Sequence, residues 1–189
     1  MMNDKRVVLL FSLVLGLGQL AFTQKIFWQA ETGKAAIKSD APLEIIKAES
    51  HEVKGIILPE TKSFAFSIRM NSFQGFNSDI QQAHFLENYV EQKKYPNATF
   101  TGKFIEDIPF DTPGTYSVRA KGNLEIHGVV KERIIRGNLT IRKGSITVQS
   151  DFFIPVADHG ITIPKIVMQK IAEQISVDIN IDFTEKIKS

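Results

Sequence analysis

The chain has 189 residues, of which 43% are hydrophobic and 23% charged, with a formal net charge of +2. A nearly neutral chain of this length excludes a nucleic-acid partner bound through excess positive charge, and it suits one domain with a substantial core. Since there is no cysteine, disulfides, thiolate metal ligands, a thiol nucleophile and a lipoprotein anchor are excluded as well.

The first predicted element is a secretory signal peptide. A basic pair at residues 5–6 precedes an apolar run over residues 7–20, and small residues follow. This order is typical of signal peptides, and the run is shorter than the ~20 apolar residues of a spanning helix. We expect residues 1–23 to be a signal peptide cleaved near Thr23, the alternative being an uncleaved anchor. Residues 24–189 then form one domain of a periplasmic or secreted protein.

Most of the remaining sequence alternates apolar and polar residues with a period of two. Between Tyr116 and Ile126, for example, every second residue is apolar or glycine, and the residues between them are polar or charged. This period is typical of strands with one buried and one solvated face. We expect strands over residues 64–70, 98–104, 116–126, 135–141, 146–152 and 175–183, and weaker ones over 35–38, 43–48 and 55–58.

Two segments break the alternation and predict short helices. Ser78 can cap a helix over residues 79–91, whose first turn carries Asp79 at the positive end of the helix dipole. Pro164 suits the first position of a second helix, an amphipathic turn or two that continues to Ile171.

Turn signals separate the predicted strands. Two prolines make residues 107–114 a loop, and Lys143-Gly144 predicts a tight hairpin turn in which glycine takes a positive φ. Short alternating strands joined by hairpins favour an all-β fold, either an antiparallel barrel or a sandwich.

The stretch "GNLEIHGVVKE" (122–132) holds one of only four histidines. Counting the alternation from Tyr116 places His127 on the polar face, beside Gly128. We therefore interpret it as a solvent-facing or loop-bonded histidine rather than a metal ligand, since no second ligand lies at a recognisable spacing. A bulge at Gly128 would reverse this facing.

The other histidines give no stronger signal for a metal or a reaction. His84, Glu87 and Glu91 could share one helical face and bind a divalent cation, but solvated side chains are commoner on such a face. His51 and His159 lie in a predicted turn and loop. A histidine-dependent enzyme would require two or more of the four to converge. Since no nucleophile-elbow serine, zinc-protease helix or phosphate loop occurs, we expect no catalytic residue, no metal and no cofactor.

Three blocks, in this order, resemble the YceI-like family: "HFLENYVEQKKYPNATFTGKF" (84–104), "GNLEIHGVVKE" (122–132) and "SDFFIPVADHGITIP" (150–164). The likeness extends over residues 33–185 and is closest to the Bacteroidetes-type envelope branch, with its His-Phe-x-x-x-Tyr and Tyr-Pro-x-Ala-x-Phe stretches. The better-studied branch carries histidines where this chain reads "SFAFSIRMNSFQGF". This departure bears on the ligand more than on the fold.

The resemblance implies an eight-stranded, lipocalin-like antiparallel barrel with one or two short helices. It further implies a non-enzymatic carrier that holds a lipid, polyisoprenoid or similar long-chain apolar ligand in the barrel lumen. Such a carrier has no nucleic-acid partner, and a transient contact with a membrane surface is compatible with it. The alternative is an envelope interaction module with a packed barrel, whose contact surface is the 79–91 helix and the 107–114 loop.

Alternation predicts which side chains face the lumen. Three of them are glycines, which leave a slot for an aliphatic tail or, equally, permit the strands to coil at barrel corners. The expected ligand-binding residues are Phe64, Phe66, Ile68, Phe100, Gly102, Phe104, Val118, Gly122, Leu124, Ile126, Gly137, Leu139, Val148, Phe152 and Ile179.

Overall fold

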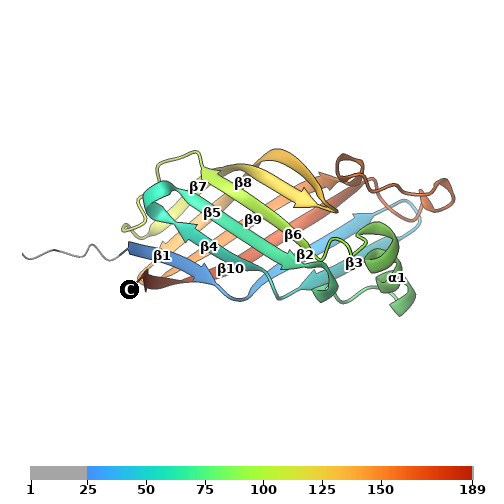
Figure 1. The fold of residues 1–189 in the computed structure, drawn as a ribbon, viewed down its shortest axis with the longest axis horizontal. Helices are drawn as coiled ribbons and strands as arrows, with labels where there is room; N and C mark the ends of the chain where they lie inside the picture. The colour runs from blue at the N-terminus through green and yellow to red at the C-terminus, as the bar shows by residue number, and fades with distance from the viewer. Residues whose placement is uncertain (1–24, 189) are drawn as a thin grey trace, which may run out of the picture.

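The structure, a computed structural model, describes residues 25–188 and consists mainly of long antiparallel strands (Figure 1). The predicted signal peptide, residues 1–23, lies outside the described residues. Among the described residues, no helix has the length and hydrophobicity needed to cross a membrane. The strands are β1 Lys25–Ala30, β2 Gly33–Asp40, β3 Ile45–Ser50, β4 Lys54–Leu58, β5 Ser63–Arg69, β6 Asn97–Phe104, β7 Gly114–Ile126, β8 Val129–Arg142, β9 Ser145–Pro155 and β10 Gln174–Lys188.

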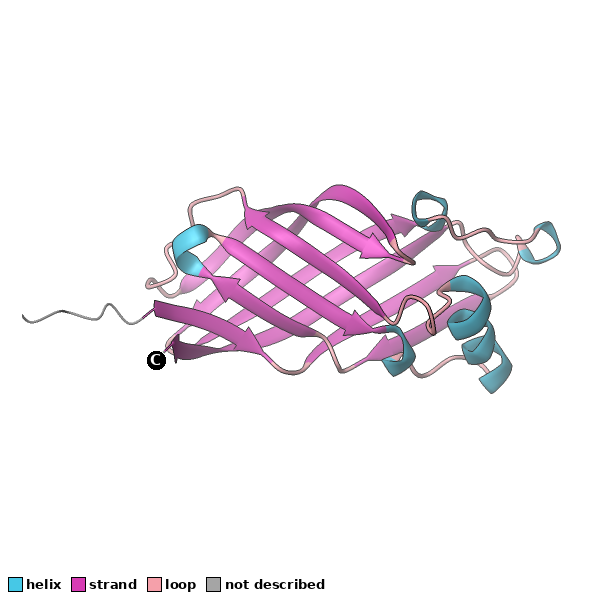
Figure 2. Cartoon of the chain, viewed as in Figure 1, coloured by secondary structure: helices cyan, strands magenta, loops and turns pink. Residues whose placement is uncertain are grey.

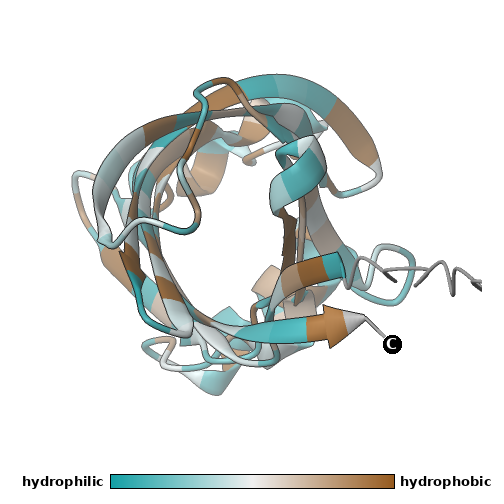
Figure 3. Cartoon of the chain, turned by 90° about the vertical axis from the view of Figure 1, so that its left-hand side faces the viewer, coloured by the Kyte–Doolittle hydropathy of each residue, from teal (hydrophilic) through white to brown (hydrophobic). Residues whose placement is uncertain are grey.

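These strands form one closed sheet in the order β1-β4-β5-β6-β7-β8-β9-β10, with β1 pairing back onto β10. The β2–β3 pair extends this wall, since β2 pairs with the first half of β10 while β1 pairs with its end. Counting β1 with β2 and β3 with β4 as two interrupted strands, the wall is an eight-stranded antiparallel barrel, seen end-on in Figure 3. The expected fold class is confirmed.

The sequence analysis missed one strand, β1. Its alternating residues are Ile26, Trp28 and Ala30, of which Trp28 and Ala30 are buried. The alternation is short and directly follows the predicted cleavage site, which is why it was not recognised. The omission matters because β1 makes the pairing that closes the barrel, from Lys25 opposite Lys188 to Gln29 opposite Thr184.

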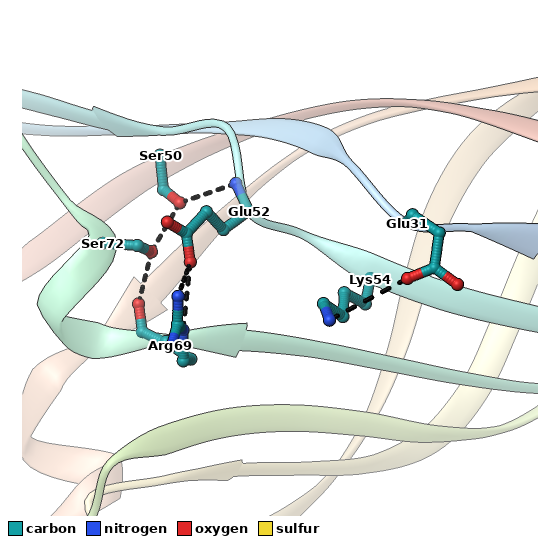
Figure 4. A network of polar contacts seen from close by, with 6 residues as sticks. All are labelled: Glu31, Ser50, Glu52, Lys54, Arg69 and Ser72. Atoms are coloured by element: carbon teal, nitrogen blue, oxygen red, sulfur yellow. Dashed lines mark hydrogen bonds and ion pairs between the residues drawn. The ribbon is translucent and has the colours of Figure 1, made fainter.

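A polar network secures the interruption between β3 and β4 (Figure 4). The Ser72 hydroxyl donates its only proton to the Arg69 carbonyl at 2.6 Å. The buried Ser50 hydroxyl, which lies 2.6 Å from the Ser72 hydroxyl, is therefore the donor in the bond between the two serines. Ser50 in turn accepts from the Glu52 backbone N–H at 3.1 Å. Arg69 donates to the Glu52 carboxylate at 3.0 Å through Nε. The buried hydroxyl is therefore satisfied, as a low-dielectric site requires.

The helical segments within residues 25–188 gather at one end of the barrel, away from the end where β1 begins and β10 stops, with the exception of η1 Pro59–Thr61 (Figure 2). Ser78 caps α1 as predicted, accepting from the Gln81 backbone N–H at 3.2 Å. The helix is shorter than expected, because the α-helical turns give way to π-helical ones. The segments at this end are η2 Met70–Ser72, α1 Asp79–His84, η3 Phe85–Tyr89, η4 Val156–His159 and η5 Lys165–Val167.

The opposite end of the barrel is filled with large apolar side chains. Phe183, Ile57 and Ile146 are fully buried, and Trp28 and Phe64 are nearly so. Interdigitated aromatic and branched side chains leave little void at native packing density. We call this region the packed end and the helix-bearing region the mouth end.

Candidate ligand-binding cavity

The lumen holds a cavity of about 430 Å³ that runs towards the mouth end. Its wall is formed almost entirely by apolar side chains from β2, β5 to β10 and the helical segments. Pockets for small molecules are typically ~300–1,000 Å³ and mostly apolar with a few polar groups. The size and chemistry of this space therefore suit an apolar ligand or the tail of a larger amphiphile.

A phenylalanine cluster forms the floor of the cavity. Phe64 lies at its centre, with ring centroids 5.3 Å from Phe66, 4.9 Å from Phe100 and 5.1 Å from Phe104. Phe66 also packs edge-on against Phe183 at 6.0 Å. Phe66, Phe100 and Phe104 line the cavity, whereas Phe64 and Phe183 lie behind them. The cluster thus separates the hollow half of the lumen from the packed end.

The cavity reaches the surface beside α1. His84, which is exposed, lines it together with the partly exposed Glu44 and Gln81. Gln81 donates to the Glu44 carboxylate, so α1 is joined to the turn between β2 and β3 at this point. Polar groups at the entrance and hydrocarbon inside are the arrangement that an amphiphile requires.

Twelve of the fifteen predicted lumen residues lie on the cavity wall, and Phe64, Gly102 and Gly122 do not. Phe64 supports the floor from behind. The twelve wall residues are Phe66, Ile68, Phe100, Phe104, Val118, Leu124, Ile126, Gly137, Leu139, Val148, Phe152 and Ile179. Their role in binding a ligand stays a prediction.

The idea that glycines open a slot for a tail is wrong for Gly102 and Gly122. The two residues are paired across β6 and β7, where the backbones approach closely. A Cβ on Gly102 would lie 2.1 Å from the Lys121 carbonyl oxygen, and one on Gly122 would lie 2.3 Å from that of Thr101. Gly137 lines the cavity, but its Cβ would meet the Gln149 oxygen at 2.7 Å. Gly102 and Gly122 thus permit a close approach of the backbones of β6 and β7, whereas the alternative offered from the sequence, strand coiling at barrel corners, stays a prediction.

Several cavity residues were missed because they lie outside strongly alternating strands. The segment after β9 contributes Ile163, Val167 and Ile171, which are spaced by four. The segment after β5 contributes Phe73, Phe76 and Phe85, which pack against one another with centroids 5.1–5.8 Å apart. Helical spacing was a usable signal for the first set. The second set follows an irregular path that only the tertiary fold defines.

His127 is loop-bonded, as one of the two interpretations held, but it is not solvent-facing. It occupies the β7–β8 turn with φ 52°, and its Nδ1 lies 3.1 Å from the His159 carbonyl oxygen, to which it donates. Its ring packs edge-on against Tyr95, and Nε2 lies 3.2 Å from a Glu91 carboxylate oxygen. The residue thus ties the turn to segments on both sides.

His159 is fully buried and lies next to His127, but the contact between them joins the His127 ring to the His159 backbone carbonyl. Its Nδ1 donates to the Val129 carbonyl at 3.0 Å, which occupies that nitrogen. Burial lowers the pKa of His159 below its usual 6.5 and so favours the neutral ring. Since each Nδ1 is bonded to a backbone carbonyl, the pair fastens loops together.

The suggested cation site on one helical face is not formed. His84 lies at the cavity entrance, whereas Glu91 has left the helix with φ 44° and faces His127. Within residues 25–188, no group of three or more histidine and acidic side chains is placed to hold a metal ion.

The wall of the barrel is incomplete between β8 and β9 towards the mouth. Ladder pairing joins only residues 138–142 to 145–149. Beyond it, side chains bridge the strands: Ser150 donates to the Arg136 carbonyl at 2.6 Å, and Arg133 donates to that of Phe153 at 2.9 Å. This part of the wall is therefore held by fewer main-chain bonds than the rest.

A closed eight-stranded barrel with a half-hollow apolar lumen defines a lipocalin-like class of ligand-binding protein. The model of the YceI-like domain matches residues 31–183, and the chain belongs to this family. The family assignment agrees with the resemblance on which the barrel fold was predicted. A comparison with the curated proteins finds no match.

Three solved structures share the fold at low sequence identity. A polyisoprenoid binding domain from Saccharophagus degradans, implicated in plant cell wall breakdown, is 16% identical with a TM-score of 0.69, covering 86% of this chain and 99% of that one. BcnA of Burkholderia cenocepacia is 13% identical with a TM-score of 0.65, covering 79% and 95%. The Campylobacter jejuni YCEI protein is 19% identical with a TM-score of 0.50, covering 73% and 82%.

Proposed function

We propose that this protein is a periplasmic or secreted carrier that holds the tail of a polyisoprenoid or similar lipid in its lumen. The observation that carries the proposal is the apolar cavity of about 430 Å³ between the phenylalanine floor and the mouth. The polyisoprenoid-binding neighbour supports the ligand class. The predicted signal peptide supports the location.

The cavity volume limits how much of a tail is enclosed. At the ~30 Å³ that a water-sized group occupies, 430 Å³ holds about 14 heavy atoms, close to three isoprene units. Burial of each methylene stabilises the complex by ~0.8 kcal/mol, so a tail of about 14 heavy atoms contributes about 11 kcal/mol. Association itself costs ~4–15 kcal/mol. Binding therefore depends on filling the cavity, and any further units of a longer ligand lie outside it.

Chain-length dependence tests this proposal. We expect affinity to rise steeply from geraniol to farnesol, which have two and three isoprene units, and to rise little for geranylgeraniol, which has four. Isothermal titration calorimetry measures each affinity. Affinity should also depend weakly on salt, since the wall is apolar. Equal affinities across the series, or no binding at all, would contradict the proposal.

A matched pair of variants tests whether the ligand binds inside the cavity. Ala35 is buried and lines the cavity, whereas the adjacent Ala36 points to the other face of β2. We expect Ala35→Phe to weaken farnesol binding at least tenfold and Ala36→Phe to leave it unchanged. If Ala35→Phe does not fold by circular dichroism, Val177→Phe repeats the test from β10.

The alternative of a packed interaction module is disfavoured by the same cavity. A barrel filled throughout by phenylalanine would have no such void, and only the packed end has that character.

A further inference from the structure

The segment over residues 161–172, which we call the lid segment, has apolar side chains on two opposite sides. Ile163, Val167 and Ile171 line the cavity. Ile166 faces away from them and is 92% exposed, and Met168 is 44% exposed. Isolated exposed apolar residues are ordinary on a protein surface, but here they are carried by the segment that covers the lumen. Water therefore contacts large apolar side chains on the outer face of this segment.

Two neighbouring segments add apolar side chains at the same end. The Leu43 backbone N–H donates to the Gln169 carbonyl at 2.8 Å, which fixes Leu43 beside the lid segment. Ile80 is adjacent to Gln81, whose side chain donates to Glu44. Leu43 is 66% exposed and Ile80 68%. The three segments lie together at the mouth end (Figure 1). Exposed apolar side chains from three segments thus lie near the entrance, outside its polar groups.

Positive charge accompanies the apolar residues of the lid segment. Lys165 and Lys170 flank Ile166 and Met168, and neither forms an ion pair within residues 25–188. No acidic residue occurs from His159 to Ala172. Acidic residues border it at both ends, Asp158, which pairs with Arg133, and Glu173. Others lie on the neighbouring segments, Asp79 in α1 and Glu44 bonded to Gln81. The lid segment itself carries only positive charge. Charge complementarity therefore favours an anionic partner on the side of the lid segment.

We propose that the lid segment, with Leu43 and Ile80, is a docking face for the surface of an anionic lipid bilayer. Ile166, Met168 and Leu43 enter the boundary between headgroups and acyl chains, and the lysines reach anionic headgroups while their stems stay in the apolar layer. This inference rests on the proposed carrier function, since docking places the cavity entrance against the source of its lipid.

Sedimentation with lipid vesicles tests the docking face. The ligand-free protein is mixed with vesicles of phosphatidylcholine containing about a third phosphatidylglycerol, and the bound fraction is measured over a range of lipid concentrations. Each lysine near an anionic surface contributes roughly a fivefold gain in partitioning, so Lys165→Gln and Lys170→Gln should each weaken binding about fivefold. Ile166→Asp should weaken it by at least tenfold.

Matched controls lie at the packed end. Ile26 is 46% exposed there, and Lys143 lies in the β8–β9 turn. Ile26→Asp and Lys143→Gln should leave vesicle binding unchanged. Equal losses in these controls, or no sedimentation of the unaltered protein, would overturn the docking face. Self-association through this face would overturn it too, if sedimentation velocity without vesicles shows a dimer that Ile166→Asp abolishes.

Farnesol titration in the absence of vesicles separates this inference from the carrier function. Ile166→Asp should bind farnesol like the unaltered protein, because Ile166 does not line the cavity. Farnesol binding without vesicle binding rejects the docking face alone. Vesicle binding without farnesol binding rejects the carrier function and leaves the docking face supported.

Discussion

The two ends of this barrel are built from the same strands but differ in what fills them. At the packed end, Phe183, Ile57 and Ile146 exclude solvent completely. At the mouth end the same strands enclose a cavity of about 430 Å³, and β8 and β9 are joined by side chains in place of a ladder. The difference indicates that dense packing is concentrated in one half and the cavity in the other.

The two ends of the barrel also differ in how they are closed. The pairing of β1 with β10 lies at the packed end, whereas the mouth is completed by α1, η4 and the lid segment. Regions with few buried contacts and few main-chain bonds open at lower free energy than a dense core. In the proposed carrier function, ligand exchange at the mouth would therefore leave undisturbed the core that holds the barrel together.

The largest expected effect compares two phenylalanines on neighbouring strands. Phe183→Ala removes a fully buried ring from the packed end and should lower the free energy of unfolding by about 3–5 kcal/mol. Phe152→Ala should cost less than half of that, because Phe152 is only half-buried and already borders a void. Urea denaturation measures both. Equal losses would show that the two ends do not differ in stability.

A smaller effect is expected from the close approach of β6 and β7. Gly102→Ala places a methyl group 2.1 Å from a backbone oxygen, and the required backbone shift should cost about 1–3 kcal/mol. Gly114→Ala is the control, since its Cβ meets only the Tyr116 side chain at 3.1 Å. Thermal unfolding of both variants measures the difference. A Gly102→Ala variant as stable as the control would mean that this contact is not tight.

The smallest effect concerns pH at the mouth end. Because burial lowers the pKa of His159 below 6.5, the unfolded chain takes up a proton that the folded chain does not. The contribution of His159 to the free energy of unfolding should therefore be full well above pH 6.5 and decrease as the pH falls through 6.5, by at most ~1.4 kcal/mol per pH unit, down to the folded pKa. Urea denaturation from pH 5 to 8 measures this slope, and His159→Gln should reduce it. An unchanged slope in that variant would show that His159 is not its source.

Much of the barrel could be predicted because a strand with one solvated and one buried face alternates polar and apolar residues with a period of two. That rule correctly located six long strands, and it placed residues such as Phe100, Leu139 and Ile179 on the cavity wall. It could not predict where the lumen is filled and where it is empty, since inward-facing Phe64 and Phe66 follow the same pattern. Filling depends on which rings meet across the barrel, as Phe66 meets Phe183.

The mouth was harder to predict because no period governs it. His127 was placed on the polar face by alternation, but a turn with φ 52° directs its ring against Tyr95. Ile166 was expected on an amphipathic turn, yet it projects into solvent while Val167 faces the cavity. Such positions follow from how loops from distant parts of the chain meet.

The pairing of β1 with β10 has a consequence for how the chain can be assembled. Lys25 lies opposite Lys188, so the ring of strands stays open until β10 pairs with β1, almost the full length of the described chain away. Contacts so distant in sequence are associated with slow folding. The same geometry brings both termini of the described chain together, far from the entrance. A circular permutant that joins these two termini and opens the Lys143-Gly144 turn would preserve every strand pairing of the barrel. In it, the β1–β10 pairing would become a local hairpin.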